Sequence, residues 1–280
     1  MELSAFAIRT FSNLLEKRTG QQLAENRVWR VESALQPLMR AHGITDFDRL
    51  ATMVANGRDE VLAASVAEGL LNHESFFFRD PAVFNQLIEL IGTRVRQARA
   101  KEKRIRIWCA GCSTGQEAYS LAISFAERVE QWQGWTIDIL GTDVSRNAID
   151  RARAGVFTQF EIQRGLPVRQ MLRWFDSRNE DWHALPEITK RVNFRVHSLL
   201  DEAPGAGRFD VVLCRNVLLY FTPPVRAEVF GRIREAIADD GVMMLGAGET
   251  VLGLTERFEA DPDVRGLYRP ATGKASVRAA

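Results

Sequence analysis

The stretch that decides the fold is RIRIWCAGCSTGQEAYSLAI, residues 104–123. It places a short apolar run, a turn and a helical stretch in direct succession, an order typical of a strand followed by a helix. Gly111 and Gly115 lie in the turn. Because glycine permits close approaches denied to other residues, a ligand can pass over such a turn and meet the free amides of the helix. The stretch therefore indicates a ligand site, although tight packing of helix on strand would also explain both glycines.

The side chains of this turn narrow the choice of ligand. It lacks the G-x-G-x-x-G spacing that cradles a dinucleotide pyrophosphate and the Gly-Lys-Ser/Thr of a P-loop. Glu117 instead places a carboxylate in the first turn of the helix, where it repels phosphate and attracts an ammonium or sulfonium cation. S-adenosylmethionine carries both cations, so we predict it as the cofactor.

Toward the C-terminus, short apolar runs alternate with helical stretches, which is typical of strand-helix-strand units in a parallel sheet. The predicted strands span residues 105–110, 136–141, 192–196, 210–214 and 242–246, and the predicted helices begin near Gly115, Ser145 and Pro223. The sequence therefore predicts an α/β fold, a doubly wound Rossmann-like S-adenosylmethionine-dependent methyltransferase domain.

Toward the N-terminus, apolar residues recur at helical spacing from residue 5 to about residue 71. Glycines stand where these helices would end, at Gly20, Gly43 and Gly57. A further helix should begin at Pro81, with the Asp80 side chain capping its first turn. We predict an all-helical N-terminal domain over residues 1–80, a linker helix and connection over 81–103, the methyltransferase domain over 104–270 and a loose tail over 271–280.

The composition excludes several classes of protein. The net charge of +1 gives no global attraction to nucleic acid, and the basic run at 94–106 suits a helix end and an exposed connection. No apolar run reaches the roughly 18 residues of a membrane span, and the first residues lack the order of a secretory signal. The three cysteines, an odd number, favour reduced thiols. We therefore expect a cytoplasmic protein with no nucleic-acid partner and no membrane insertion.

Two of the cysteines, Cys109 and Cys112, have the C-x-x-C spacing of redox and metal sites. No second cysteine pair or nearby histidine completes a zinc site. We predict no metal.

Polar residues follow two further strands of the predicted sheet. Asp143 ends the strand after the glycine turn, where an acidic side chain can accept from the ribose hydroxyls of an adenosine; its alternative role is to cap the next helix. Arg215 and Asn216 end the strand FDVVLC and face the same edge if the sheet is parallel. Nucleobase amino-methylases resemble one another in an Asp/Asn-Pro-Pro-aromatic stretch at this place, and this chain lacks it.

Four ordered stretches together resemble a known family. They are HESFFFRDPAVF (73–84), CAGCSTGQEAYSLAI (109–123), GTDVSRNAIDRARAGVF (141–157) with FEIQRGLP (160–167), and FDVVLCRNVLLYF (209–221). Between about residues 6 and 268 the chain looks like the chemotaxis-receptor protein-glutamate methyltransferases, the CheR family. The resemblance implies a small helical domain joined to a methyltransferase domain. It also implies esterification of glutamate side chains on the cytoplasmic methylation helices of methyl-accepting receptors.

The resemblance also implies roles for single residues. Cofactor contacts would fall on His73, Ser75, Arg79, Glu117, Asp143, Ser198, Leu199, Arg215 and Asn216, although the family usually has Asn at position 73, Thr at 75 and Asn at 198. We predict that Arg79 and Tyr220 orient the acceptor carboxylate, by a charge-assisted fork and by a hydroxyl. Both residues have a purely structural alternative. Arg79 would then form an ion pair with Glu74 or Asp80 and have no further role, and Tyr220 would be a half-buried aromatic of the core.

Some family members bind a receptor tail on a small antiparallel sheet inserted in the methyltransferase domain. Here residues 165–190 read instead as a helix with Trp174 and Trp182, so we expect neither such a sheet nor binding of a receptor tail. Arg27, Arg30 and Arg40 form either a solvated helix face or a docking surface for an acidic partner. Two rival functions stay open: methyl transfer to another acceptor, and a catalytically silent cofactor-binding scaffold.

Overall fold

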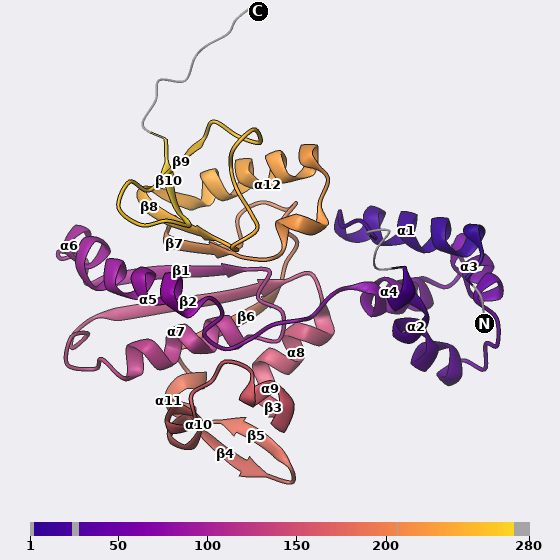
Figure 1. Ribbon diagram of the computed structural model, residues 1–280, viewed down its shortest axis with the longest axis horizontal. Coiled ribbons are helices and arrows are strands. Elements are labelled where there is room, and N and C mark those ends of the chain that lie inside the picture. The colour runs from indigo at the N-terminus through magenta and orange to yellow at the C-terminus, as the bar shows by residue number, and fades with distance from the viewer. Residues whose placement is uncertain (1–2, 24–27, 206, 272–280) are drawn as a thin grey trace, which may run out of the picture.

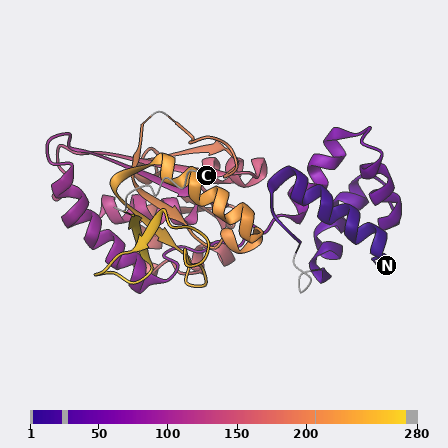
Figure 2. The same ribbon diagram turned by 90° about the horizontal axis from the view of Figure 1, so that it is seen from above.

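The computed structural model describes residues 3–23, 28–205 and 207–271. They form a helical N-terminal unit and a larger α/β unit, connected by an extended segment (Figures 1 and 2). Arg27 and the predicted tail beyond Ala271 lie outside the described residues. The division of the chain at residues 80, 103 and 270 stays a prediction.

Within its described residues, the N-terminal unit contains four helices: α1 (Ala5–Thr19), α2 (Trp29–Ala41), α3 (Phe47–Ala55) and α4 (Glu60–Leu70). They enclose a core that includes Phe11, Leu35 and Leu50, all fully buried. Gly20 ends α1 in the left-handed conformation, with φ 73°, and its N–H donates to Glu16. The predicted helical N-terminal region is confirmed. In the described part of the chain, no helix combines the length and apolar character needed to cross a membrane.

The helix that follows consists of α5 (Pro81–Leu90), a π-helical turn η2 (Ile91–Val95) and α6 (Arg96–Ala98). Its predicted start at Pro81 is confirmed, but the predicted cap is wrong. Asp80 has a left-handed backbone, with φ 56° and ψ 62°, and its side chain makes no capping hydrogen bond. Its carboxylate binds Arg215 instead.

The α/β unit is built on a seven-stranded sheet in the order β6-β2-β1-β7-β8-β10-β9. Its strands are β1 (Arg104–Ala110), β2 (Thr136–Asp143), β6 (Val192–Val196), β7 (Phe209–Cys214), β8 (Ile237–Leu245), β9 (Phe258–Ala260) and β10 (Leu267–Pro270). The first five are paired in parallel, whereas β10 runs antiparallel to β8 and β9. The predicted strands are confirmed, whereas β9 and β10 were not predicted from the sequence.

Helices cover both faces of this sheet (Figure 1). Alternate side chains of β1 point to opposite faces: Ile105 and Ile107 lie in a core with α5, α7 (Gln116–Ala126) and α8 (Arg146–Ala154). Trp108 lies in the other core, with α12 (Pro223–Ala236). The predicted starts of α7, α8 and α12 are confirmed, and the fold is the expected Rossmann-like methyltransferase fold.

A second, three-stranded antiparallel sheet lies at the bottom of Figure 1. It consists of β3 (Val156–Thr158), β4 (Phe175–Arg178) and β5 (Asp181–Ala184), in the order β3-β5-β4, beside the short helices α9 (Gln159–Gln163), α10 (Val168–Trp174) and α11 (Pro186–Thr189).

The expectation of a helix without such a sheet over residues 165–190 is therefore wrong. Asn179 and Glu180 connect β4 to β5 with φ values of 50° and 70°. Two consecutive positive φ values are typical of a type I′ hairpin turn, which matches the twist of the two strands. The turn lacks the glycine that usually marks it, so the sequence signal is weak.

Candidate active site

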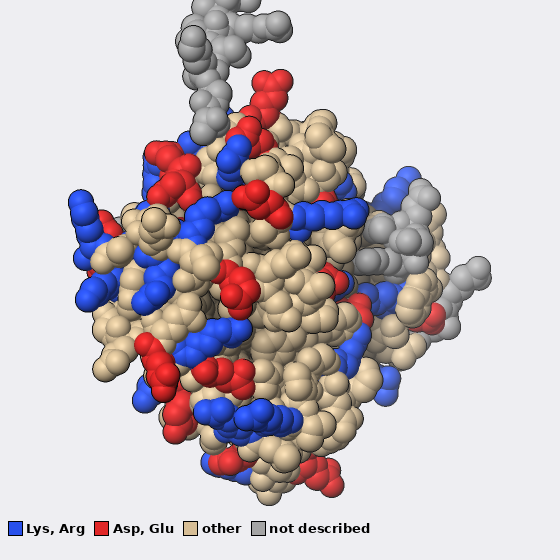
Figure 3. Space-filling model, turned by 60° about the vertical axis from the view of Figure 1, so that its left-hand side comes forward, with Lys and Arg blue, Asp and Glu red and all other residues tan. Residues whose placement is uncertain are grey.

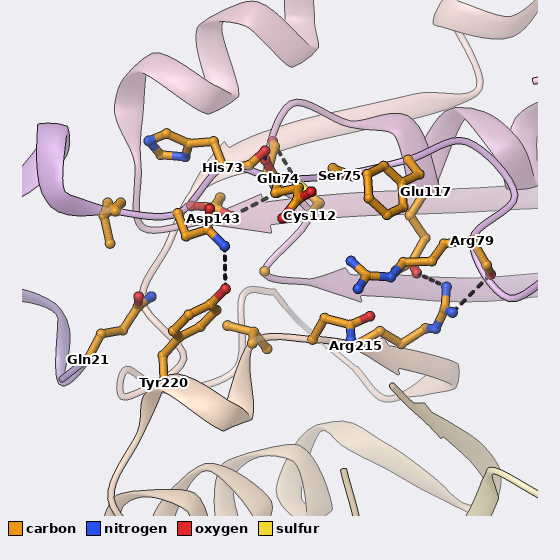
Figure 4. Close-up of a pocket in the computed structure, with 17 residues that line it drawn as sticks. Gln21, His73, Glu74, Ser75, Arg79, Cys112, Glu117, Asp143, Arg215 and Tyr220 are labelled. Carbon is orange, nitrogen blue, oxygen red and sulfur yellow. Dashed lines mark hydrogen bonds and ion pairs between the residues drawn. The ribbon is translucent and has the colours of Figure 1, made fainter. Parts of the chain in front are cut away.

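A pocket of about 630 Å³ lies where β1, β2 and β7 end, and the segment between α4 and α5 closes its other side (Figure 4). The lining includes residues predicted from the sequence: His73, Ser75, Arg79, Gly111, Glu117, Asp143, Arg215, Asn216 and Tyr220. The fold thus brings together side chains that are far apart in the chain.

The remaining predicted contacts lie elsewhere. Ser198 and Leu199 line an adjoining pocket of about 290 Å³, which shares Gly111 and Asp143 with the larger one. Gly115 lines neither pocket. It lies at the start of α7 with φ 93°, where an added Cβ would lie 3.0 Å from the Phe194 ring. Its place in the structure supports the packing interpretation of this glycine.

Gly111 brings two loops of the site together. Its φ is 76°, and its N–H donates to the Thr142 carbonyl at the end of β2 over 2.8 Å. A Cβ at this position would lie 3.1 Å from the side chain of Val217, in the loop after β7. A larger residue would therefore strain the backbone and push the β7 loop away from the pocket.

Asp143 holds the glycine turn to the end of β2. Its Oδ2 accepts from the Ser113 N–H at 2.8 Å and its Oδ1 from the Ser145 N–H at 2.9 Å. Burial raises the pKa of this carboxyl, while the two backbone donors and nearby His73 act in the opposite direction. The cap of α8 is the Ser145 side chain, so Asp143 is not the helix cap.

Arg215 is the buried centre of a charge cluster. Its side chain is 2 % exposed, with Nη1 2.8 Å from Glu117 Oε2 and Nη2 2.6 Å from Asp80 Oδ2. Nη2 also donates to the Arg79 carbonyl at 2.9 Å. Two carboxylates surround one guanidinium, so these three side chains together carry a net negative charge. That charge suits a ligand cation.

The pockets also contain buried polar atoms that lack hydrogen-bond partners among the described residues. They are Arg215 Nε and Asn216 Oδ1 in the larger pocket and His197 Nε2 in the adjoining one. Unpaired buried donors and acceptors are costly and point to a partner outside the chain. The residues therefore fit S-adenosylmethionine: Asp143 would hold its ribose, and the Arg215 cluster would lie near its cationic groups.

Glu249 was not predicted from the sequence. It lies after β8, and its carboxylate accepts from the backbone N–H groups of Asn216, Leu218, Leu219 and Gly246 at 2.7–3.3 Å. These bonds fix the loop that carries Asn216 and Tyr220. The sequence offers no motif for this role, because the four amides come from two loops that meet only in the folded chain.

Two further residues from outside the α/β unit also reach the site. Gln21 lines both pockets and forms a β-bridge with Phe221, while Asn72 donates from Nδ2 to the Tyr220 hydroxyl. Figure 4 shows Gln21 beside the Tyr220 ring. Neither residue belongs to the motifs found in the sequence. Both reach the site because the folded chain brings them against the loop after β7.

The C-x-x-C pair gives no support for redox chemistry. Cys109 and Cys112 are buried free thiols, and burial raises the pKa of both by disfavouring the thiolate. Among the described residues, no group of three or more His, Cys, Asp or Glu side chains is arranged to hold a metal ion.

The glycine turn after β1, the carboxylate after β2 and the Arg215 cluster after β7 define the class of an S-adenosylmethionine-dependent methyltransferase. The chain belongs to the CheR methyltransferase family: the family model described as CheR methyltransferase, SAM binding domain, matches residues 73–264.

Similar proteins include chemotaxis protein methyltransferases of two bacteria. One from Vibrio anguillarum is 31% identical over 254 residues, covering 90% of this chain and 91% of the relative. Chemotaxis protein methyltransferase 1 of Pseudomonas aeruginosa is 33% identical over 253 residues, covering 89% and 92%. Among solved structures, a TehB-like SAM-dependent methyltransferase from Corynebacterium glutamicum matches with a TM-score of 0.37 and 19% identity, covering 68% of this chain and 97% of that one.

Proposed function

We propose that this methyltransferase transfers the methyl group of S-adenosylmethionine to glutamate side chains of chemoreceptors, giving glutamate 5-O-methyl esters and S-adenosylhomocysteine. One observation supports a carboxylate as the methyl acceptor. Arg79 and Tyr220 point into the same pocket from different sides (Figure 4). A guanidinium and a hydroxyl are suitable donors for a carboxylate. The names of the relatives in Vibrio and Pseudomonas support a chemotaxis substrate.

The proposed reaction needs no general base. A glutamate side chain has an ordinary pKa of about 4.3, so its carboxylate is already ionised at neutral pH. When bound, S-adenosylmethionine would supply a methyl group to the acceptor oxygen and would leave as the neutral thioether S-adenosylhomocysteine. The protein contributes alignment and the removal of water from the two opposite charges.

The acidic neighbours of Arg79 bind other cations. The Glu74 carboxylate lies 2.9 Å from Arg164, and the Asp80 carboxylate lies 2.6 Å from Arg215. The guanidinium of Arg79 lies over the ring of Phe76, 4.9 Å from its centroid. This arrangement supports a role for Arg79 in binding the acceptor rather than in a local ion pair.

A nucleic-acid acceptor is less well supported. The face that carries α6 shows basic and acidic side chains interspersed (Figure 3). Three arginines of the basic run have carboxylate partners: Arg94 binds Asp261, Arg99 binds Asp210, and Arg104 binds Asp138, each at 2.6 Å. A surface with its charges neutralised in this way offers little attraction to phosphates.

Methyl transfer from radiolabelled S-adenosylmethionine to a chemoreceptor cytoplasmic fragment tests the proposed function. We expect label on the receptor fragment that is released as methanol by mild base, because a carboxyl ester hydrolyses and a methylated nitrogen or carbon does not. Base-stable label would point to another acceptor atom. The absence of label, with cofactor binding intact, would favour the scaffold function.

Substitution of Arg79 tests its part in the reaction. We expect Arg79→Ala to slow methyl transfer to the receptor fragment on the order of 100-fold, because a charge-assisted fork to the acceptor is lost. Arg79→Lys keeps the charge without the planar fork, so its rate of methyl transfer should lie between those of Arg79→Ala and the unmodified protein. Initial rates at saturating cofactor measure the effect. Turnover of the alanine variant at the rate of the unmodified protein would show that Arg79 does not orient the acceptor carboxylate.

A further inference from the structure

A chain of hydrogen bonds connects α2 of the N-terminal unit to the Tyr220 hydroxyl. Arg30, on α2, donates from Nη1 to Asn72 Oδ1 at 2.9 Å. Asn72 then donates from Nδ2 to the hydroxyl oxygen of Tyr220 (Figure 4). All three residues are half-buried, and Asn72 and Tyr220 both line the main pocket. An arginine outside that pocket is therefore coupled to a side chain that faces it.

The direction of this chain follows from the chemistry of arginine. A guanidinium has donors and no acceptor, so the atom of Asn72 that faces Arg30 must be the oxygen. The NH₂ group of Asn72 is then the one that faces Tyr220. The Tyr220 oxygen consequently accepts in this contact, and the bond from Asn72 does not use the hydroxyl proton. Arg30 thus determines the orientation of the Asn72 amide. That orientation in turn makes the Tyr220 oxygen the acceptor of the bond between Asn72 and Tyr220.

The backbone of Tyr220 is held independently of this chain. Tyr220 ends the 3-10 turn η3 (Leu218–Tyr220), whose Leu218 and Leu219 amides donate to Glu249. Its carbonyl accepts from the Gln22 N–H at 2.7 Å. Since these contacts position the main chain, the Asn72 contact acts on the hydroxyl itself.

We propose that Arg30 and Asn72 are positioning residues that turn the Tyr220 hydroxyl into a donor for the acceptor carboxylate. The proposal rests on the proposed function, since it assumes that Tyr220 binds the acceptor. It assigns part of the acceptor site to the N-terminal unit: α2 orients Asn72, and Asn72 orients the tyrosine. Substitutions along the chain should therefore lower kcat and leave cofactor binding in place.

Asn72→Asp is the sharpest test, because it changes the polarity of the contact with little change of shape. An ionised carboxylate only accepts, so the Tyr220 hydroxyl would donate to residue 72 and its proton would turn away from the acceptor. We expect kcat for the receptor fragment to fall on the order of 10- to 100-fold, as for loss of a hydrogen bond to a charged group, with the KM for S-adenosylmethionine unchanged.

A double-mutant cycle with Tyr220→Phe separates this effect from simple repulsion between the new carboxylate and the acceptor. If Asn72 acts through the hydroxyl, Asn72→Asp has little further effect on kcat in the Tyr220→Phe protein. The same fold-decrease in both backgrounds would overturn the proposal, and so would an unchanged kcat in Asn72→Asp alone.

Arg30 offers a matched pair of variants. Arg30→Lys keeps a donor for Asn72 Oδ1 and should retain kcat close to that of the unmodified protein. Arg30→Met keeps the length of the side chain and removes the donors, so the amide of Asn72 is free to turn over, and kcat should fall severalfold. Equal kcat values for the lysine and methionine variants would contradict the role of Arg30.

A spectroscopic readout tests the chain without any methyl transfer. The protein has three tyrosines, so ¹³C labelling at Cζ gives few signals, and the one lost in Tyr220→Phe is that of Tyr220. We expect this signal to shift in Asn72→Asp and Arg30→Met and to stay in place in Arg30→Lys. An unmoved signal in Asn72→Asp would overturn the proposal even in an active enzyme. A protein that shows the shifts but methylates no receptor fragment would instead refute the proposed function.

Discussion

Arg215→Met is expected to lower the free energy of unfolding by about 3–5 kcal/mol and to abolish binding of S-adenosylhomocysteine. The guanidinium of Arg215 neutralises the carboxylates of Glu117 and Asp80 in a site where its own side chain is 2 % exposed. Its removal would leave two carboxylates facing each other across a pocket with no cation between them. Its Nη2 bond to the Arg79 carbonyl would also be lost, so the segment that closes the pocket would lose an anchor.

Thermal or denaturant unfolding measures the change in stability, and calorimetry measures the binding. Arg215→Lys is the matched control: it keeps the charge but cannot reach both carboxylates and the carbonyl together, so it should recover only part of the stability. In the double variant Arg215→Met, Asp80→Asn, one of the two unpaired carboxylates is removed, and part of the lost stability should be restored. A methionine variant as stable as the unmodified protein would show that the cluster does not hold the site together.

Asp143→Ala is expected to remove binding of S-adenosylhomocysteine, because the acceptor for the ribose hydroxyls is lost. The change also leaves the amides of Ser113 and Ser145 without their acceptor. Asp143→Asn is therefore the cleaner variant. It keeps one of the two acceptor oxygens, so one of the two amides would face an NH₂ donor in its place. The free energy of unfolding at neutral pH should therefore fall less than in Asp143→Ala, while the affinity falls. Unchanged affinity in both variants would remove the ribose assignment.

The raised pKa of Asp143 adds a pH dependence to this prediction. Because burial favours the protonated form, the ionised carboxylate is lost at a higher pH than in an ordinary aspartate. As the pH falls through that value, affinity for S-adenosylhomocysteine should fall in the unmodified protein and stay flat in Asp143→Asn. For folding the sign is opposite: the raised pKa contributes stability below the unfolded value, and that contribution is lost as the pH rises through the folded one.

The meeting of Glu117, Asp143 and Arg215 in one pocket could be predicted because it depends on local order along the chain. A strand, a glycine turn and a helix follow one another around Gly111, and parallel strands end at one edge of the sheet, so Glu117, Asp143 and Arg215 were expected to meet. Asp80 shows where local reasoning fails. An aspartate before a proline predicts a helix cap, but here a buried guanidinium from a distant strand end binds its carboxylate.

Other features depend on contacts between segments far apart in the chain. The Glu249 carboxylate accepts from backbone amides of two different loops. Asn72 contacts Tyr220 only because the folded chain brings the segment after α4 against the α/β unit. The β4–β5 hairpin was missed for a different reason: its turn uses Asn179 and Glu180 at positive φ in place of glycine. The structure thus corrects the expectation that this family member lacks the small antiparallel sheet.

We propose that this pocket brings S-adenosylmethionine and a glutamate carboxylate of a receptor together for methyl transfer. Peptide mass spectrometry of a chemoreceptor cytoplasmic fragment, after incubation with the protein and the cofactor, tests it most directly. We predict that glutamate residues gain the mass of one methylene and lose it again in mild base, and that Arg79→Ala slows the gain on the order of 100-fold. A methyl group mapped to a nitrogen or to nucleic acid, or one that survives base, would contradict the account.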